Sequence, residues 1–165
     1  NSFFNDLIKA KPDNEYYKSG DYWQSPIETL VRGKGDCEDF AIAKYVSLRI
    51  LGIPKDQLLI GIVRLQKFGE LHAVLLYYPD SENDPWVMDN LSYNYLGSQR
   101  SQLIRMSLKI LHCNIKPLIG FNENNYVEFR RGMKKHYLDK NPINEIPMFT
   151  IAMYNSKNLL SNISS

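Results

Sequence analysis

The sequence predicts an α+β fold in which one well-defined helix packs on an antiparallel sheet. Apolar side chains recur at helical spacing over residues 37–51, directly after a capping residue. Residues 57–89 then contain three short runs rich in Val, Ile, Leu and Tyr, separated by turn residues. The 165 residues are 44% hydrophobic and carry no repeat, low-complexity tract or long linker. We therefore expect a single domain over residues 1–165 that can form its core without a disulfide or a structural metal ion.

Composition excludes several classes of function. Twenty Lys and Arg against 18 Asp and Glu leave a formal net charge of +2, which is too balanced for a dedicated nucleic-acid binder. The apolar runs are far shorter than the roughly 20 residues that cross a bilayer, so no membrane span is predicted. The two cysteines lie in unrelated surroundings, which argues against a disulfide framework. The chain begins with Asn, and removal of a secretory signal would leave such a start.

The first half of the chain is predicted to be mainly helical. Residues 2–10 show a short helical pattern, and residues 11–24, interrupted by Pro and Gly, are predicted to form a loop. The run Ser25–Glu28 is a strong helix start, with Ser as the cap, Pro at the first helical position and Glu closing a capping box. That helix is expected to end near Arg32.

A second helix is the firmest of the predicted elements. A Gly-Lys-Gly break at residues 33–35 ends the first helix, and Asp36 can cap the second with Asp39 in its first turn. Gly52 and Pro54 stop it. The apolar positions that keep helical spacing along it are Ala41, Tyr45, Leu48 and Leu51.

The predicted strands cover residues 59–65, 71–78 and 86–89. Turn residues at 67–70 and 79–85 would connect them as antiparallel hairpins. Residues 98–107 favour a further helix, and the rest of the tail yields no clear pattern.

Cys37 is a candidate nucleophile. It occupies the first helical position after a Gly-flanked turn, where unpaired N–H groups and the positive end of the helix dipole favour a thiolate. The alternative is a small buried apolar residue, which is the commonest fate of a free cysteine.

A base and an orienting carboxylate are available on the predicted sheet. His72 lies on the second predicted strand and Asp89 ends the third, and directly opposite side chains of adjacent strands have Cβ atoms roughly 5 Å apart. If the helix start packs on this sheet, Cys37 would attack, His72 would transfer the proton and Asp89 would orient the imidazole. A lone His on a strand is more often structural, so that alternative stays open.

Several separated segments resemble one protein family. GKGDCEDFAIAKY at residues 33–45 is followed by LHAVL at 71–75 and VMDNL at 87–91, and NSFFN and DYWQSP precede them. Together they are similar to the bacterial transglutaminase-like cysteine proteinases, within them to the periplasmic proteases that release large biofilm adhesins. The resemblance covers about the first hundred residues. It implies a papain-like, transglutaminase-like cysteine protease fold with Cys37, His72 and Asp89 as the triad.

The resemblance also implies a calcium site, with Asp36, Glu38 and Asp39 as its candidate ligands. Three carboxylates around a cysteine raise the pKa of the thiol and oppose catalysis when they are unpaired. A hard dication with oxygen ligands would neutralise them and fix the loop that aims the sulfur. In the alternative interpretation, Asp36 and Asp39 only cap the helix and Glu38 faces solvent.

The oxyanion of an acyl-transfer reaction needs preorganised hydrogen-bond donors. We expect the backbone N–H of Cys37 to be one of them. Trp23 or Gln24, in the loop before the capping-box helix, could supply the second. Trp23 fits the role of a core anchor equally well.

The resemblance implies a calcium-dependent periplasmic cysteine endopeptidase that cleaves the N-terminal region of a large surface adhesin and so promotes biofilm dispersal. Its implied regulatory partner is the periplasmic domain of an inner-membrane cyclic-di-GMP receptor. Two other functions remain as alternatives. One is acyl transfer to an amine, as in transglutaminases, and the other is a non-catalytic calcium- or receptor-binding module of the same fold.

Overall fold

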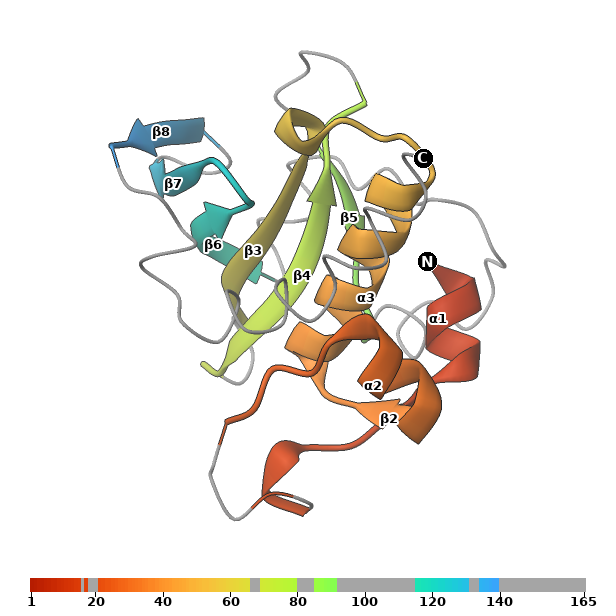
Figure 1. Ribbon diagram of the computed structural model, residues 1–165. Coiled ribbons are helices and arrows are strands. Elements are labelled where there is room, and N and C mark those ends of the chain that lie inside the picture. Colours follow the sequence, from red (N-terminus) through yellow and green to blue (C-terminus); the bar gives the residue numbers. More distant parts are fainter. Residues whose placement is uncertain are drawn as a thin grey trace, which may run out of the picture.

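The computed structural model shows a helical layer packed against an antiparallel sheet (Figure 1). It describes residues 1–15, 17, 21–65, 69–79, 85–91, 115–130 and 134–139. The helices are α1 (Ser2–Leu7), α2 (Pro26–Arg32) and α3 (Cys37–Ile50), with short 3-10 turns η1 (Asp13–Glu15) and η2 (Lys55–Gln57). The strands are β1 (Lys9–Ala10), β2 (Lys34–Gly35), β3 (Leu58–Leu65), β4 (Leu71–Tyr77), β5 (Trp86–Met88), β6 (Ile115–Phe121), β7 (Tyr126–Arg130) and β8 (Lys134–Leu138).

Local signals in the sequence place α2 and α3. The Ser25 side chain accepts from the backbone N–H of Glu28, whose carboxylate accepts from the backbone N–H of Ser25 in return. Gly33 ends α2 in the left-handed conformation at φ 61°, which costs glycine nothing. Asp36 is the N-cap of α3, so Cys37 is its first residue. The predictions for both helices are confirmed.

The larger sheet has the strand order β5-β4-β3-β6-β7-β8, and every described pairing within it is antiparallel. Strands β3, β4 and β5 follow one another as hairpin neighbours, which confirms the predicted strands at residues 59–89. The sequence pattern did not predict β6, β7 and β8 in the tail, nor the short parallel pair of β1 with β2. The helix predicted at residues 98–107 lies outside the described residues, as do residues 67–68 and 80–84 of the two predicted hairpin turns.

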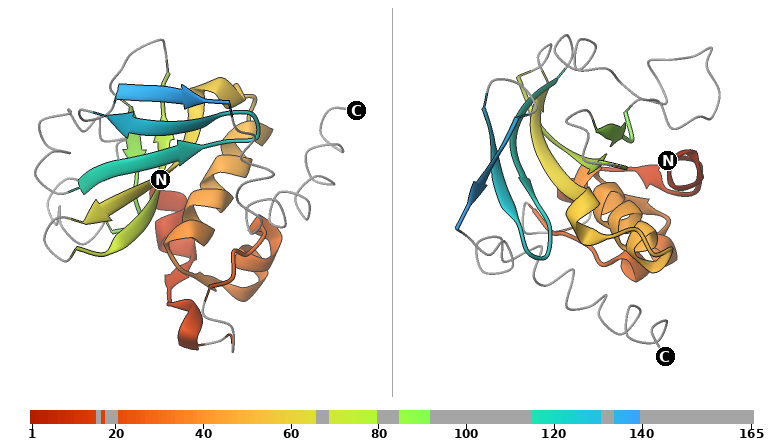
Figure 2. Two further views of the ribbon diagram at one scale, coloured as in Figure 1. Left: turned by 90° about the vertical axis from the view of Figure 1, so that its left-hand side faces the viewer. Right: turned by 90° about the horizontal axis from the view of Figure 1, so that it is seen from above.

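The sheet buries apolar side chains on both faces. Helix α3 lies along one face, as the two views of Figure 2 show, and Ile42 and Tyr45 of the helix are fully buried against it. Their partners in this cluster include Leu58, Ile60, Ala73, Leu75, Met88 and Phe121. The other face buries Leu59, Val63, Val74, Leu76, Tyr78, Val87 and Val127. The packing of α3 on β4 is what brings the start of the helix to the first residues of β4.

No helix in the described part of the chain is long and apolar enough to cross a membrane.

Candidate active site

The start of α3 meets the first residues of β4 at Cys37. Its side chain is half-buried and packs against the core cluster that α3 shares with β4. The backbone N–H of Ala73 hydrogen-bonds to the sulfur, which lowers the pKa of the thiol. Since Ala73 directly follows His72 on β4, the structure brings the sulfur to the strand segment that carries the histidine.

His72 and Asp89 lie in direct contact. His72 Nε2 is 2.8 Å from Asp89 Oδ1, and the histidine is only 5% exposed. The backbone N–H of Leu91 donates to the same carboxylate oxygen over 2.8 Å, which holds the carboxylate in place. Because Nε2 faces the carboxylate, Nδ1 is the ring nitrogen left to exchange a proton with a thiol.

The pairing of His72 with Asp89 differs in one respect from the sequence-based prediction, which treated the two residues as directly opposite each other on adjacent strands. The pairing of β4 with β5 sets Leu75 opposite Met88, so continuing it by one residue sets Asp89 opposite Val74. His72 is therefore the diagonal neighbour of Asp89 on the same face, and the two are not directly opposite. A diagonal pair spans a longer distance, which the imidazole is long enough to bridge.

Glu38 counteracts the expected activation of Cys37. The Cys37 thiol donates a hydrogen bond to Glu38 Oε2 over 3.1 Å. Burial raises the pKa of the thiol well above its usual range, and the charge of Glu38 raises it further. In this arrangement the helix start alone does not yield the thiolate that its dipole favours.

Acidic side chains crowd around the start of α3. Asp13, Asp36 and Asp39 each offer an oxygen within 4.8 Å of the others, and Asp13, Asp21 and Glu38 form a second such group. Burial is the main cause that raises the pKa of Asp36 to about 6, of Asp39 to about 7 and of Glu38 to about 9. Several buried carboxyl groups thus lie together, and a bound cation would offset the free-energy cost of ionising them.

The cluster differs from the predicted set. Asp36, Glu38 and Asp39 are all in it, but Asp13 and Asp21 from the loop before α2 join them. Within the described part of the chain, Asp36 Oδ1 is buried and has no hydrogen-bond partner, which suits an oxygen that is left for a cation. The only sequence signal for the two added residues was the abundance of Asp in residues 11–24.

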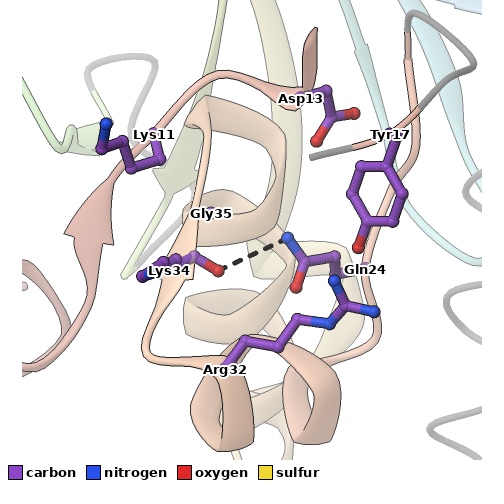
Figure 3. Close-up of a pocket in the computed structure, with 7 residues that line it drawn as sticks. All are labelled: Lys11, Asp13, Tyr17, Gln24, Arg32, Lys34 and Gly35. Atoms are coloured by element: carbon purple, nitrogen blue, oxygen red, sulfur yellow. Dashed lines mark hydrogen bonds between the residues drawn. The ribbon is translucent and has the colours of Figure 1, made fainter. Parts of the chain in front are cut away.

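Gln24 braces Asp39. The backbone N–H of Gln24 donates to Asp39 Oδ1 over 2.7 Å, and Gln24 Nε2 donates to Asp39 Oδ2 over 2.6 Å and to the carbonyl of Lys34 over 3.4 Å. These contacts engage the donors of Gln24, so it offers none to an oxyanion in this arrangement. Gln24 also lines a pocket of about 160 Å³ in front of β2 (Figure 3). The other residues of the pocket are Lys11, Asp13, Tyr17, Arg32, Lys34 and Gly35.

Trp23 has the features of the core anchor that was considered for it. Its ring stacks on Phe121 with centroids 5.9 Å apart and planes 17° apart. Its indole N–H donates to Asp21 Oδ1 over 3.1 Å, which links the ring to the acidic cluster. To serve the oxyanion, the indole N–H of Trp23 would have to leave Asp21 Oδ1 and donate to the substrate oxygen instead.

Comparison with known proteins identifies the family. A family profile described as bacterial transglutaminase-like cysteine proteinase matches residues 1–103, more than half of the chain. The chain belongs to this family. The predicted resemblance and the α+β, transglutaminase-like fold class are thereby confirmed. No curated protein sequence matches the chain.

Solved structures of one protein have the same fold as this chain. Legionella pneumophila LapG is 30% identical over 93% of this chain and 73% of its own, with a TM-score of 0.69. Its EGTA-treated and calcium-bound forms are both 29% identical, each with a TM-score of 0.70 and 93% of this chain covered. The matches cover 74% and 75% of those two chains. Family membership makes this chain a transglutaminase-like cysteine protease.

Proposed function

We propose that this protease is a calcium-dependent endopeptidase with Cys37, His72 and Asp89 as its triad. The observation that carries the proposal is the short contact of His72 with Asp89, one residue from the Ala73 N–H that bonds to the Cys37 sulfur. A nucleophile beside a base that a carboxylate orients is the arrangement that nucleophilic catalysis requires.

The proposed reaction begins when His72 holds the proton of Cys37 and the thiolate attacks the scissile carbonyl carbon. Collapse of the tetrahedral intermediate breaks the C–N bond, and His72 gives its proton to the leaving amine. His72 then takes a proton from water as the water oxygen attacks the thioester carbonyl carbon. The C–S bond breaks, the acid leaves, and His72 returns the proton to the Cys37 sulfur. Asp89 keeps the imidazole in the required tautomer and stabilises its charged form. The Cys37 N–H is the proposed first donor to the oxyanion.

Calcium fits the acidic cluster of this chain. The calcium-bound structure of Legionella LapG shows that a relative binds this ion. Here the ligands would come from Asp36, Glu38 and Asp39 together with Asp13 and Asp21. Bound calcium would supply the positive charge that lets these buried carboxyls ionise without raising the pKa of the neighbouring thiol.

The proposed substrate is an extended, small-residue segment near the N-terminus of a large surface adhesin, cut in the periplasm. The proposed regulator is the periplasmic domain of an inner-membrane cyclic-di-GMP receptor, which would sequester the protease. Both proposals rest on the likeness to the family's adhesin-releasing members.

The rate of alkylation of Cys37 against pH, in calcium and in chelator, tests the site. Peptide masses separate Cys37 from Cys113, which serves as the internal control. We expect Cys37 in calcium to react far faster than Cys113 below pH 7, and to slow when calcium is removed. A Cys37 as inert as Cys113 in both conditions would overturn the proposal and favour a binding module.

Product masses test the reaction itself. The N-terminal region of an adhesin, incubated with the protease, should give two fragments whose masses sum to the substrate plus one water. Cross-linked product with loss of ammonia would identify the transglutaminase reaction instead. Cys37→Ala should abolish cleavage while the fold, followed by circular dichroism, is kept. Cleavage that survives this substitution would disprove the triad.

A further inference from the structure

A hydrogen bond joins the first helix of the chain to the segment that carries Asp89. Asn5 of α1 donates from Nδ2 to the backbone carbonyl of Asp89 over 2.9 Å, across 84 positions in the sequence. A carbonyl oxygen can only accept, so the amide nitrogen of Asn5 is the atom that faces it. The contact is partly shielded from solvent. It therefore fixes a main-chain group of the proposed triad from a distant part of the chain.

Asp89 lies where the strand pairing ends. Strand β5 is at one end of the described sheet, and its pairing with β4 ends at Met88 opposite Leu75. Asp89 is the next residue. Its carboxylate accepts from the Leu91 N–H and contacts His72, and both of these contacts act on the side chain. The bond from Asn5 differs from them because it acts on the peptide group that carries the side chain.

Helix α1 is itself anchored to the helix that carries Cys37. Phe4 and Ile8 of α1 are buried in one cluster with Phe40 and Ala43 of α3. Figure 1 shows α1 beside α3. Because Phe4 directly precedes Asn5, this packing sets the position from which the amide donates. Helix α1 thus links the helix of the proposed nucleophile to the Asp89 segment.

The second polar atom of the Asn5 side chain is left unsatisfied. Within the described part of the chain, Oδ1 is buried and has no hydrogen-bond partner. A buried polar atom without a partner destabilises a fold and offsets what the bond from Nδ2 contributes. An apolar side chain of similar size would avoid that cost. The effect of the amide on the position of Asp89 supplies a reason for it that stability does not.

We propose that Asn5 is a positioning residue of the active site, which holds the Asp89 peptide group so that the carboxylate meets His72 Nε2. This inference rests on the proposed triad. The carboxylate has to keep its 2.8 Å contact with Nε2, and a displacement of about 1 Å is enough to cost much of the rate of an enzyme. Asn5 acts through Asp89 and not on the reacting atoms.

Hydrogen exchange tests whether the contact forms in the unmodified protein, so it does not depend on the folding of a variant. The Nδ2 protons of Asn5 are followed by NMR in calcium, with the exposed Asn14 as the matched amide. We expect the slower Nδ2 proton of Asn5 to exchange at least about tenfold more slowly than those of Asn14, because it is held in a hydrogen bond. Equal exchange rates would overturn the proposal.

The tautomer of His72 reports the position of the carboxylate without turnover. Asn5→Leu removes the donor and nearly keeps the side-chain volume. At about pH 9, where a free imidazole is neutral, we expect the share of the Nδ1–H tautomer to rise about threefold in this variant, since a displaced carboxylate holds the Nε2–H less well. Nitrogen-15 chemical shifts of the ring measure the two forms. An unchanged ratio would contradict the positioning role.

Kinetics with a matched control separate positioning from a structural role. Phe4→Leu loosens the packing of α1 but keeps the Asn5 amide. We expect Asn5→Leu to lower kcat about tenfold with KM unchanged, whereas Phe4→Leu lowers the melting temperature and keeps kcat within about twofold. If kcat followed the melting temperature in both variants, Asn5 would be only structural and the proposal would fail.

Asp89→Asn distinguishes a failure of this inference from a failure of the triad. If Asp89→Asn abolishes turnover and Asn5→Leu leaves it intact, the triad stands and the role of Asn5 is wrong. If Asp89→Asn itself leaves kcat nearly unchanged, Asp89 is not in the triad, and the role of Asn5 falls with it.

Discussion

The thiol of Cys37 donates its hydrogen bond to the carboxylate of Glu38, the next residue in the chain, with 3.1 Å between Sγ and Oε2. The residue that should attack is therefore held by a neighbour that opposes its ionisation. The same carboxylate belongs to one of the two acidic groups that could hold a cation. Glu38 can thus couple the reactivity of the thiol to occupancy of the metal site.

Replacement of Glu38 by Gln tests this coupling. Glu38→Gln removes the charge that raises the pKa of the thiol and keeps the side-chain length. In chelator at pH 10, above the pKa of about 9 of Glu38, we expect alkylation of Cys37 to be about tenfold faster than in the wild type. Peptide mass mapping measures the rate, and the exposed Asp56→Asn serves as the charge-matched control. An equal rate in the two proteins would contradict the coupling.

Replacement of Asp89 by Asn tests the orienting contact. Asn keeps an oxygen that can accept from the Leu91 N–H, so we expect the fold to be retained. The imidazole of His72 loses the carboxylate that fixes its tautomer, and kcat should fall by about 100-fold or more. Steady-state kinetics on an adhesin fragment and circular dichroism check the two statements. A loss of only a few-fold would exclude Asp89 from the triad.

Two glycines that flank Lys34 allow a matched test of the metal site. A Cβ at Gly35 would lie 2.7 Å from Asp39 Oδ2 and 2.8 Å from Asp39 Cβ, so Gly35→Ala must displace Asp39. We expect a loss of about 2–3 kcal/mol of stability and at least a tenfold weaker affinity for calcium. Unfolding in urea and calcium titration by calorimetry measure these quantities.

Gly33 provides the control for this substitution. A Cβ there meets no atom of the described residues within 4 Å, but φ is +61°. Gly33→Ala should therefore cost about 1 kcal/mol of backbone strain and leave the affinity for calcium unchanged. If both variants weakened calcium binding equally, displacement of Asp39 would not be the cause.

The burial of Lys44 predicts a dependence of stability on pH. Its pKa is lowered in the folded state from 10.5 to about 7, so between these values the unfolded chain binds more protons than the folded one. The free energy of unfolding should therefore gain a contribution of a few kcal/mol as the pH rises through this window. Urea unfolding of the wild type and Lys44→Met at pH 6.5 and 9.5 measures it. The stability advantage of the Met variant should shrink at the higher pH, and a constant difference would contradict the prediction.

The sequence by itself determined the elements that local signals define. The capping box at Ser25 and the cap at Asp36 set the starts of α2 and α3, because a cap satisfies backbone groups within a few residues of chain. The runs rich in Val, Ile, Leu and Tyr placed β3, β4 and β5. The order of the segments around Cys37, His72 and Asp89 was enough to indicate the family, which the comparison confirmed.

The tertiary structure decided what depends on contacts distant in the chain. The recruitment of Asp13 and Asp21 to the acidic cluster needs the path of a loop with no periodic pattern. The diagonal contact of His72 with Asp89 needs the strand register. The burial of Lys44 needs the packing of α1 on α3, because in the sequence a lysine there looks like any helix lysine. Local propensity is encoded in neighbouring residues, whereas a pKa and a ligand set arise from groups that only folding brings together.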